Sequence, residues 1–135
     1  MIPIKNDAEI ELMRAAGRAA RTVLERVCAL VRPGVTTREL DEAAADYMSE
    51  MKCKSAFLGY RGFPGHVCIS VNEEVVHGIG GVRRLQPGDI VSLDVGVNKS
   101  GWIGDTAETV AVGQVSSGAQ KLLAATAEAL RVALL

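Results

Sequence analysis

The sequence lacks any excess of positive charge. Fifteen Lys and Arg stand against sixteen Asp and Glu, which leaves a formal net charge of -1. A balance of this kind argues against direct binding of nucleic acid or of an anionic membrane surface. No stretch approaches the roughly 20 apolar residues of a membrane-spanning helix, and residues 1–7 have neither the apolar core nor the cleavage site of a secretory signal. We therefore expect a small or peptide-like ligand, with no membrane and no nucleic acid as partners.

Cysteine is scarce and unpatterned. The three residues Cys28, Cys53 and Cys68 are odd in number and form neither a zinc-type pair nor a disulfide framework. This usage predicts a reducing compartment, the cytoplasm. The glycines around Ile79 likewise lack the Lys-Ser/Thr of a phosphate loop, which argues against nucleotide binding.

The chain is long enough to bury a core, because 135 residues with 48% hydrophobic content indicate one globular domain or half of a larger one. Two capping boxes, at Asn6 and at Thr36, begin apolar patterns of helical period that reach to about Val31 and to Met51. A third helix is expected over 116–135. It ends without a capping signal, so we expect the chain to be cut within its domain.

The middle of the chain has a different character. Residues 57–65 are rich in glycine and aromatic rings and predict an irregular loop. A short strand is expected over 67–71, and another is expected to begin at 75–78. Residues 90–97 form the clearest strand pattern, with 102–112 as its antiparallel return.

The alternation in the strand over 90–97 separates two faces. One face carries Val91, Leu93, Val95 and Val97 and predicts a core, whereas the other carries Asp94. If the hairpin loop has an even number of residues, Asp94 directly faces Asp105.

An opposed pair of carboxylates needs an explanation, because like charges across a ladder are destabilising. Either one carboxyl takes up a proton or a cation lies between them. We expect Gly96 and Gly104 to leave room beside the pair. A three-residue turn would instead place the two aspartates on opposite faces, each simply solvated. Carboxylate ligands suit Mg, Mn, Fe, Co or Zn, and the sequence does not choose among them.

The two histidines lie in different settings. His77 ends a β-branched run just before flexible glycines, where a side chain can project into a cleft. Its pattern fits a hydrogen-bonded, partly buried histidine as well as a catalytic one. His66 lies inside the Pro-Gly loop and is expected at the surface or at the rim of a site.

The motifs, taken together, closely resemble those of type I methionine aminopeptidases. They are residues 59–64, 67–73, 77–79, 88–91, 93–95 and 104–106. The resemblance implies the pita-bread fold of class α/β (α+β), with residues 1–135 as its amino-terminal half, an antiparallel sheet covered by helices. It also implies metal-dependent removal of the initiator methionine from nascent chains whose second residue is small.

The resemblance further implies roles for individual residues. Asp94 and Asp105 match two of the family's five metal ligands, which hold two divalent metal ions in a complete site. His77 matches a histidine that contacts the substrate and stabilises the transition state. Tyr60 and Cys68 match the methionine pocket and Phe63 its rim. Two further positions match less specifically: Phe57 replaces a pocket cysteine of many bacterial members, and Asn72 lies in a turn that binds a monovalent cation in some.

The remaining ligands, one histidine and two glutamates, are expected in a second half. This chain alone is therefore expected to be weakly active or inactive. Two partners are considered besides peptides that begin with Met: a carboxy-terminal half, or a second copy of the chain. The alternative function is a non-catalytic module that binds peptides or proteins.

Overall fold

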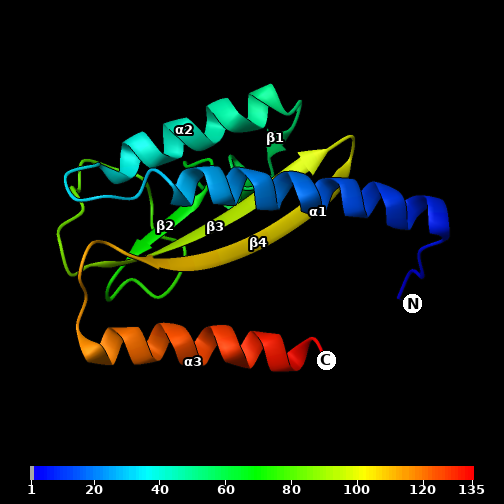
Figure 1. Ribbon diagram of the computed structural model, residues 1–135. Coiled ribbons are helices and arrows are strands. Elements are labelled where there is room, and N and C mark those ends of the chain that lie inside the picture. Colours follow the sequence, from blue (N-terminus) through cyan, green and yellow to red (C-terminus); the bar gives the residue numbers. More distant parts are fainter. Residues whose placement is uncertain (1) are drawn as a thin grey trace.

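The computed structural model describes residues 2–135, which form three long helices and a four-stranded sheet (Figure 1). The elements in chain order are α1 (Asp7–Cys28), α2 (Thr37–Glu50), β1 (Lys54–Ser55), the 3-10 turn η1 (Tyr60–Gly62), β2 (Cys68–Val71), β3 (Ile90–Lys99), β4 (Trp102–Ala111) and α3 (Ser117–Ala133). The expected α+β class with an antiparallel sheet is confirmed.

Strand β3 is the centre of the sheet. It pairs with β4 along its whole length on one edge, while β2 and β1 share its other edge, and every pairing is antiparallel. The β3–β4 hairpin closes through Ser100 and Gly101, which have φ angles of 54° and 87°. Two left-handed residues are what a tight two-residue hairpin turn requires. Asn98 stabilises the turn, since its side-chain oxygen accepts a hydrogen bond from the Gly101 N–H.

Helices α1 and α2 begin where the capping boxes predict. The Asn6 and Thr36 side chains accept from the backbone N–H groups of Glu9 and Glu39, and each glutamate accepts in return. Helix α1 ends at Cys28, three residues before the predicted Val31.

Both α1 and α2 pack on the same face of the sheet, whereas α3 lies apart from them, beyond the edge strand β4 (Figure 1). The covered face contains the core, and the side chains of Val91, Leu93, Val95 and Val97 are fully buried there, as predicted. Helix α3 begins at its Ser116 cap but buries none of its residues. None of the helices within residues 2–135 is long and apolar enough to cross a membrane.

The strand predicted to begin at 75–78 is wrong. This segment has no strand geometry, and it touches β2 through Gly78, whose carbonyl accepts from the Ile69 N–H at 2.9 Å. The Gly78 N–H donates to the Ser70 side-chain hydroxyl of β2 at 3.0 Å instead of to a backbone carbonyl. Val75 and Val76 are 84% and 63% exposed, so their apolar side chains do not contribute to a buried strand.

Candidate functional site

The two aspartates lie on the same face of the β3–β4 hairpin, but in a different register from the predicted one. Asp94 is paired with Ala107 and Asp105 with Gly96, so direct opposition of the two aspartates is wrong. The turn consists of Ser100 and Gly101, which shifts the pairing by two residues and makes the aspartates diagonal neighbours. Because a shift of two preserves the face of every side chain, both carboxylates still reach the same site, and the three-residue turn is also wrong.

The two glycines expected beside the pair serve different faces. At Gly96, a Cβ atom would come within 2.3 Å of the Phe57 ring, so this glycine admits an aromatic ring to the site. At Gly104, it would come within 2.3 Å of the backbone oxygen of Ala16 in α1. The expectation that Gly104 leaves room beside the aspartates is therefore wrong, because its missing side chain lets α1 approach the covered face.

The Asp94 carboxyl is in an unfavourable environment for its charge. Burial, as the larger cause, and the negative charge of Asp105 together raise the pKa of Asp94 to about 6, while His77 acts in the opposite direction. Its Oδ1 atom is buried without a hydrogen-bond partner within residues 2–135. A buried carboxylate oxygen without a donor is costly. Both a proton and a cation would relieve this cost.

The aspartates alone make an incomplete metal site. No group of three His, Cys, Asp or Glu side chains that could hold a metal ion occurs within the described part of the chain. The orphaned oxygen of Asp94 and the hard donor chemistry of two carboxylates fit a divalent metal. Within residues 2–135, the two aspartates would supply only part of a coordination shell.

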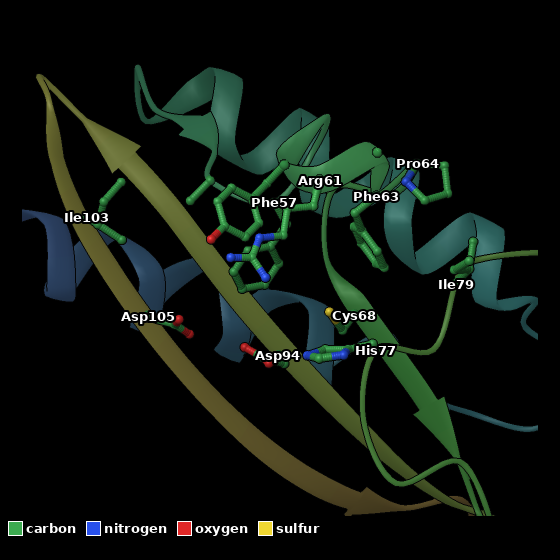
Figure 2. Close-up of a pocket in the computed structure, with 13 residues that line it drawn as sticks. Phe57, Arg61, Phe63, Pro64, Cys68, His77, Ile79, Asp94, Ile103 and Asp105 are labelled. Carbon is green, nitrogen blue, oxygen red and sulfur yellow. The ribbon is translucent and has the colours of Figure 1, made fainter.

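All six residues with predicted metal, catalytic or substrate roles line one cavity of about 880 Å³. Figure 2 shows Asp94 and Asp105 side by side on the two strands, with His77 and Cys68 next to Asp94. The loop residues Tyr60 and Phe63 line the same cavity, together with Phe57. Three of the five aromatic residues of the chain thus gather at one polar pair.

Two side chains that the sequence analysis did not select hold this aromatic loop. The Ser55 hydroxyl donates to the His66 carbonyl at 2.6 Å and accepts from the N–H groups of Phe57 and Leu58. The Asp41 carboxylate accepts from the N–H groups of His66 and Val67. These anchors fix where the loop begins and ends, and no sequence spacing indicates them.

The position of His77 follows from the residue after it. A Cβ at Gly78 would lie 2.1 Å from the Ile69 carbonyl oxygen, so only glycine allows the backbone to pass this close to β2. His77 itself has a φ of 61°, a rare conformation for a residue with a side chain. This backbone presents the imidazole to the Asp94 side of the cavity (Figure 2).

Cys68 forms part of the wall of the site. Burial, as the larger cause, and the negative charges of Asp94 and Asp105 together raise the pKa of its thiol to about 11. The thiol therefore remains protonated at neutral pH. It acts as a small apolar surface and not as a nucleophile.

Several lining residues were not predicted, namely Ala56, Arg61, Gly62, Pro64, Ile79 and Ile103. Strand alternation from Asp105 would have found Ile103, while the others depend on the course of the loops. His66 lies in a separate, smaller cavity of about 500 Å³ beside α2 and is half-buried. Asn72 is used structurally, because its side chain donates to Asp89 and accepts from the Ile90 N–H.

Comparison with known proteins adds a family match. Residues 11–134 match the model of metallopeptidase family M24. The chain is 47% identical over 135 residues to a methionine aminopeptidase of Escherichia coli K12, covering 98% of this chain and 51% of the relative. It is 46% identical over 129 residues to the methionine aminopeptidase of Clostridium acetobutylicum, covering 95% and 52%. The chain thus spans about half the length of the curated relatives it matches.

Solved structures give the same picture. The methionine aminopeptidase of Rickettsia prowazekii superimposes with a TM-score of 0.95 at 37% identity, over 97% of this chain and 53% of that one. The enzyme of Thermotoga maritima gives a TM-score of 0.95 at 39% identity, over 98% and 54%. A prolidase of Pyrococcus furiosus, at 20% identity and a TM-score of 0.74, shares the fold alone. The expected pita-bread fold is confirmed by these neighbours.

Proposed function

Because the chain belongs to metallopeptidase family M24, we propose that it forms the amino-terminal half of an enzyme that removes an initiator methionine followed by a small residue. The observation that carries this proposal is the cavity that joins Asp94 and Asp105 to an aromatic wall. Membership of a peptidase family supports an enzyme, and the buried, unpartnered oxygen of Asp94 supports metal binding at this pair.

Asp94 and Asp105 would hold the divalent metal ions, two in a complete site, with further ligands from the other half. Bound metal would supply an activated water and Lewis acidity at the scissile carbonyl. The two carboxylates also attract the positive amino terminus of a peptide, which orients it with its first residue toward the strands.

The residues around the pair have separate tasks. The imidazole of His77 lies beside Asp94 and is placed to donate a hydrogen bond to the carbonyl oxygen as negative charge develops on it. Phe57, Phe63 and Cys68 are partly or fully buried and form a soft apolar wall for a methionine side chain, whose full burial contributes about 1.5–3 kcal/mol. Tyr60 is 64% exposed and covers the outer edge of this wall.

The cellular setting follows from the same proposal. Cys28, Cys53 and Cys68 are all free thiols, which is compatible with a reducing cytoplasm. Nascent chains that begin with Met would be the substrates there.

The test is reconstitution. The chain is mixed with the second half of the Escherichia coli relative, loaded with Co or Mn, and given a Met-Ala-Ser peptide. We expect release of methionine from Met-Ala-Ser but not from Met-Lys-Ser, and loss of release in Asp94→Asn. The matched control is Asp46→Asn, an exposed aspartate of α2. A metal-loaded complex that binds the peptide without cleaving it would overturn the proposal in favour of a peptide-binding module.

A further inference from the structure

The cavity has one positively charged guanidinium, on the side that faces the aspartates. Among the lining residues within 2–135, Arg61 is the only lysine or arginine. Figure 2 shows its side chain extending from the aromatic loop into the opening between that loop and the strands that carry Asp94 and Asp105. The cavity therefore has an acidic side on the sheet and a basic side on the loop.

The backbone of Arg61 is held in a strained conformation. Its φ and ψ are 50° and 30°, in the left-handed region that costs a residue with a Cβ atom about 1 kcal/mol. The flanking Gly59 and Gly62 have φ angles of 81° and 82°. Backbone hydrogen bonds from Gly59 to the Phe63 carbonyl at 2.8 Å and from Phe63 to the Tyr60 carbonyl at 3.0 Å close the loop around it. The loop could carry a glycine at this position without strain, yet it carries an arginine whose direction the turn determines.

The guanidinium has no carboxylate of its own within the part of the chain that the structure describes. It forms no ion pair with Asp94, Asp105 or any other acidic group there. Its Cζ atom lies over the Tyr60 ring, 5.5 Å from the ring centroid. Five other arginines within the described residues have such partners, namely Arg14, Arg21, Arg26, Arg83 and Arg131. Arg14, for example, pairs with Glu11 at 3.1 Å in α1, on the covered side of the sheet.

We propose that Arg61 is a specificity residue that binds a carboxylate of the peptide downstream of the cleaved bond. The inference rests on the proposed function, because it takes a peptide with a free amino terminus as the ligand. Such a peptide is positive at its first residue, so the aspartate side attracts that end and the guanidinium repels it. A negative group further along the same peptide has the opposite preference. The charge polarity of the cavity thus fits a peptide with an acidic side chain at its third or fourth position, or a short peptide whose own α-carboxylate lies there.

The experiment compares peptides that differ by one charge. The chain is titrated with Met-Ala-Ser-Glu-amide and with Met-Ala-Ser-Gln-amide, and binding is followed from the Nε–H resonance of Arg61. We expect the acidic peptide to bind about threefold to tenfold more tightly at low salt, and salt of about 1 M to remove the difference. Free-acid Met-Ala-Ser against its amide tests the α-carboxylate in the same way.

Variants of the chain test whether Arg61 causes the preference for the acidic peptide. In Arg61→Gln the two peptides should bind equally, in Arg61→Lys the acidic peptide should keep part of its advantage, and Arg14→Gln should behave like the unaltered chain. Equal binding by the unaltered chain, absence of peptide binding, or a preference that survives Arg61→Gln would each overturn the proposal.

The reconstituted, metal-loaded complex separates this inference from the proposed function. Cleavage of both peptides at equal kcat/KM would overturn the role of Arg61 and leave the aminopeptidase intact. An acidic preference in binding without any cleavage would support Arg61 and count against the aminopeptidase.

Discussion

The two faces of the sheet differ in the polarity and the packing of their side chains. On the face covered by α1 and α2, valines and a leucine of β3 are fully buried and Gly104 lets the α1 backbone touch the strand. On the open face, one oxygen of the Asp94 carboxylate is buried without a hydrogen-bond partner within residues 2–135, and a second carboxylate, a histidine and aromatic rings line the same cavity. The covered face thus buries apolar side chains against each other, whereas the open face leaves a buried carboxylate oxygen without a hydrogen-bond donor within residues 2–135.

The same contrast separates the helices. Helix α1 buries six residues, while α3 buries none and exposes Leu122 and Leu130 by more than half. An amphipathic helix gains its stability mainly from packing. Within residues 2–135, α1 is therefore stabilised by packing on the sheet, whereas α3 lacks such packing.

The largest effect is expected where the covered face is tightest. Gly104→Ala would force a methyl group into the α1 backbone at Ala16 and should lower the free energy of unfolding by about 3–5 kcal/mol. Urea denaturation measures this. Gly17→Ala is the matched control, because a Cβ there meets nothing within 4 Å and alanine favours a helix by about 1 kcal/mol. A Gly104→Ala chain as stable as the original would show that α1 does not pack on β4 in this way.

The next test truncates one leucine in α1 and one in α3. Leu24→Ala in α1 removes a fully buried side chain and should cost about 2–5 kcal/mol. Leu130→Ala in α3 removes one that is 61% exposed and should change stability by less than about 0.5 kcal/mol in this chain. In the reconstituted complex the Leu130 variant should instead weaken assembly, as measured by titration calorimetry. An equal loss of stability in the two variants of the isolated chain would contradict this distinction between α1 and α3.

A smaller loss is expected from Gly78→Ala, which places a methyl group against the Ile69 carbonyl. Because the segment around Gly78 is exposed on its other side, it can swing away at a cost of about 2 kcal/mol. Hydrogen exchange should show reduced protection of the Ile69 amide, whose acceptor is the Gly78 carbonyl. Gly81→Ala should leave that protection unchanged, since its nearest atom would be 3.9 Å away.

The smallest predicted effect is an increase in folding stability. The pKa of Asp94 lies at about 6 in the folded chain, above its ordinary value of 3.8, so ionisation of this group opposes folding. Asp94→Asn should therefore stabilise the metal-free chain by about 1 kcal/mol at pH 7 to 8, after allowance for partial exposure. The gain should shrink as the pH falls through 6 and vanish below about 4.

Thermal unfolding at several pH values measures this difference, with Asp46→Asn as the control for an exposed aspartate. The same Asp94 variant should lose affinity for Mn or Co. A stability gain that persists at pH 3 would mean that charge is not its cause.

Much of the local structure followed from neighbouring residues. The capping boxes at Asn6 and Thr36 are reciprocal hydrogen bonds over three residues, so they set the helix starts without help from the rest of the fold. The alternation of side chains in β3 also depends only on neighbouring residues, so it separated the core face from the face that carries Asp94. The parity of the hairpin, although not its register, then placed both aspartates on one face.

Other features were decided by contacts far apart in sequence. Gly96 accommodates Phe57 and Gly104 accommodates α1, a difference that no pattern around either glycine indicates. Segment 75–78 has the composition of a strand, but Val75 and Val76 are exposed and the Gly78 N–H donates to the Ser70 side chain. Arg61 enters the cavity because a closed turn directs it there. Periodicity determines which way a side chain faces, whereas close packing of distant segments determines what it meets, and the chemistry of the site depends on both.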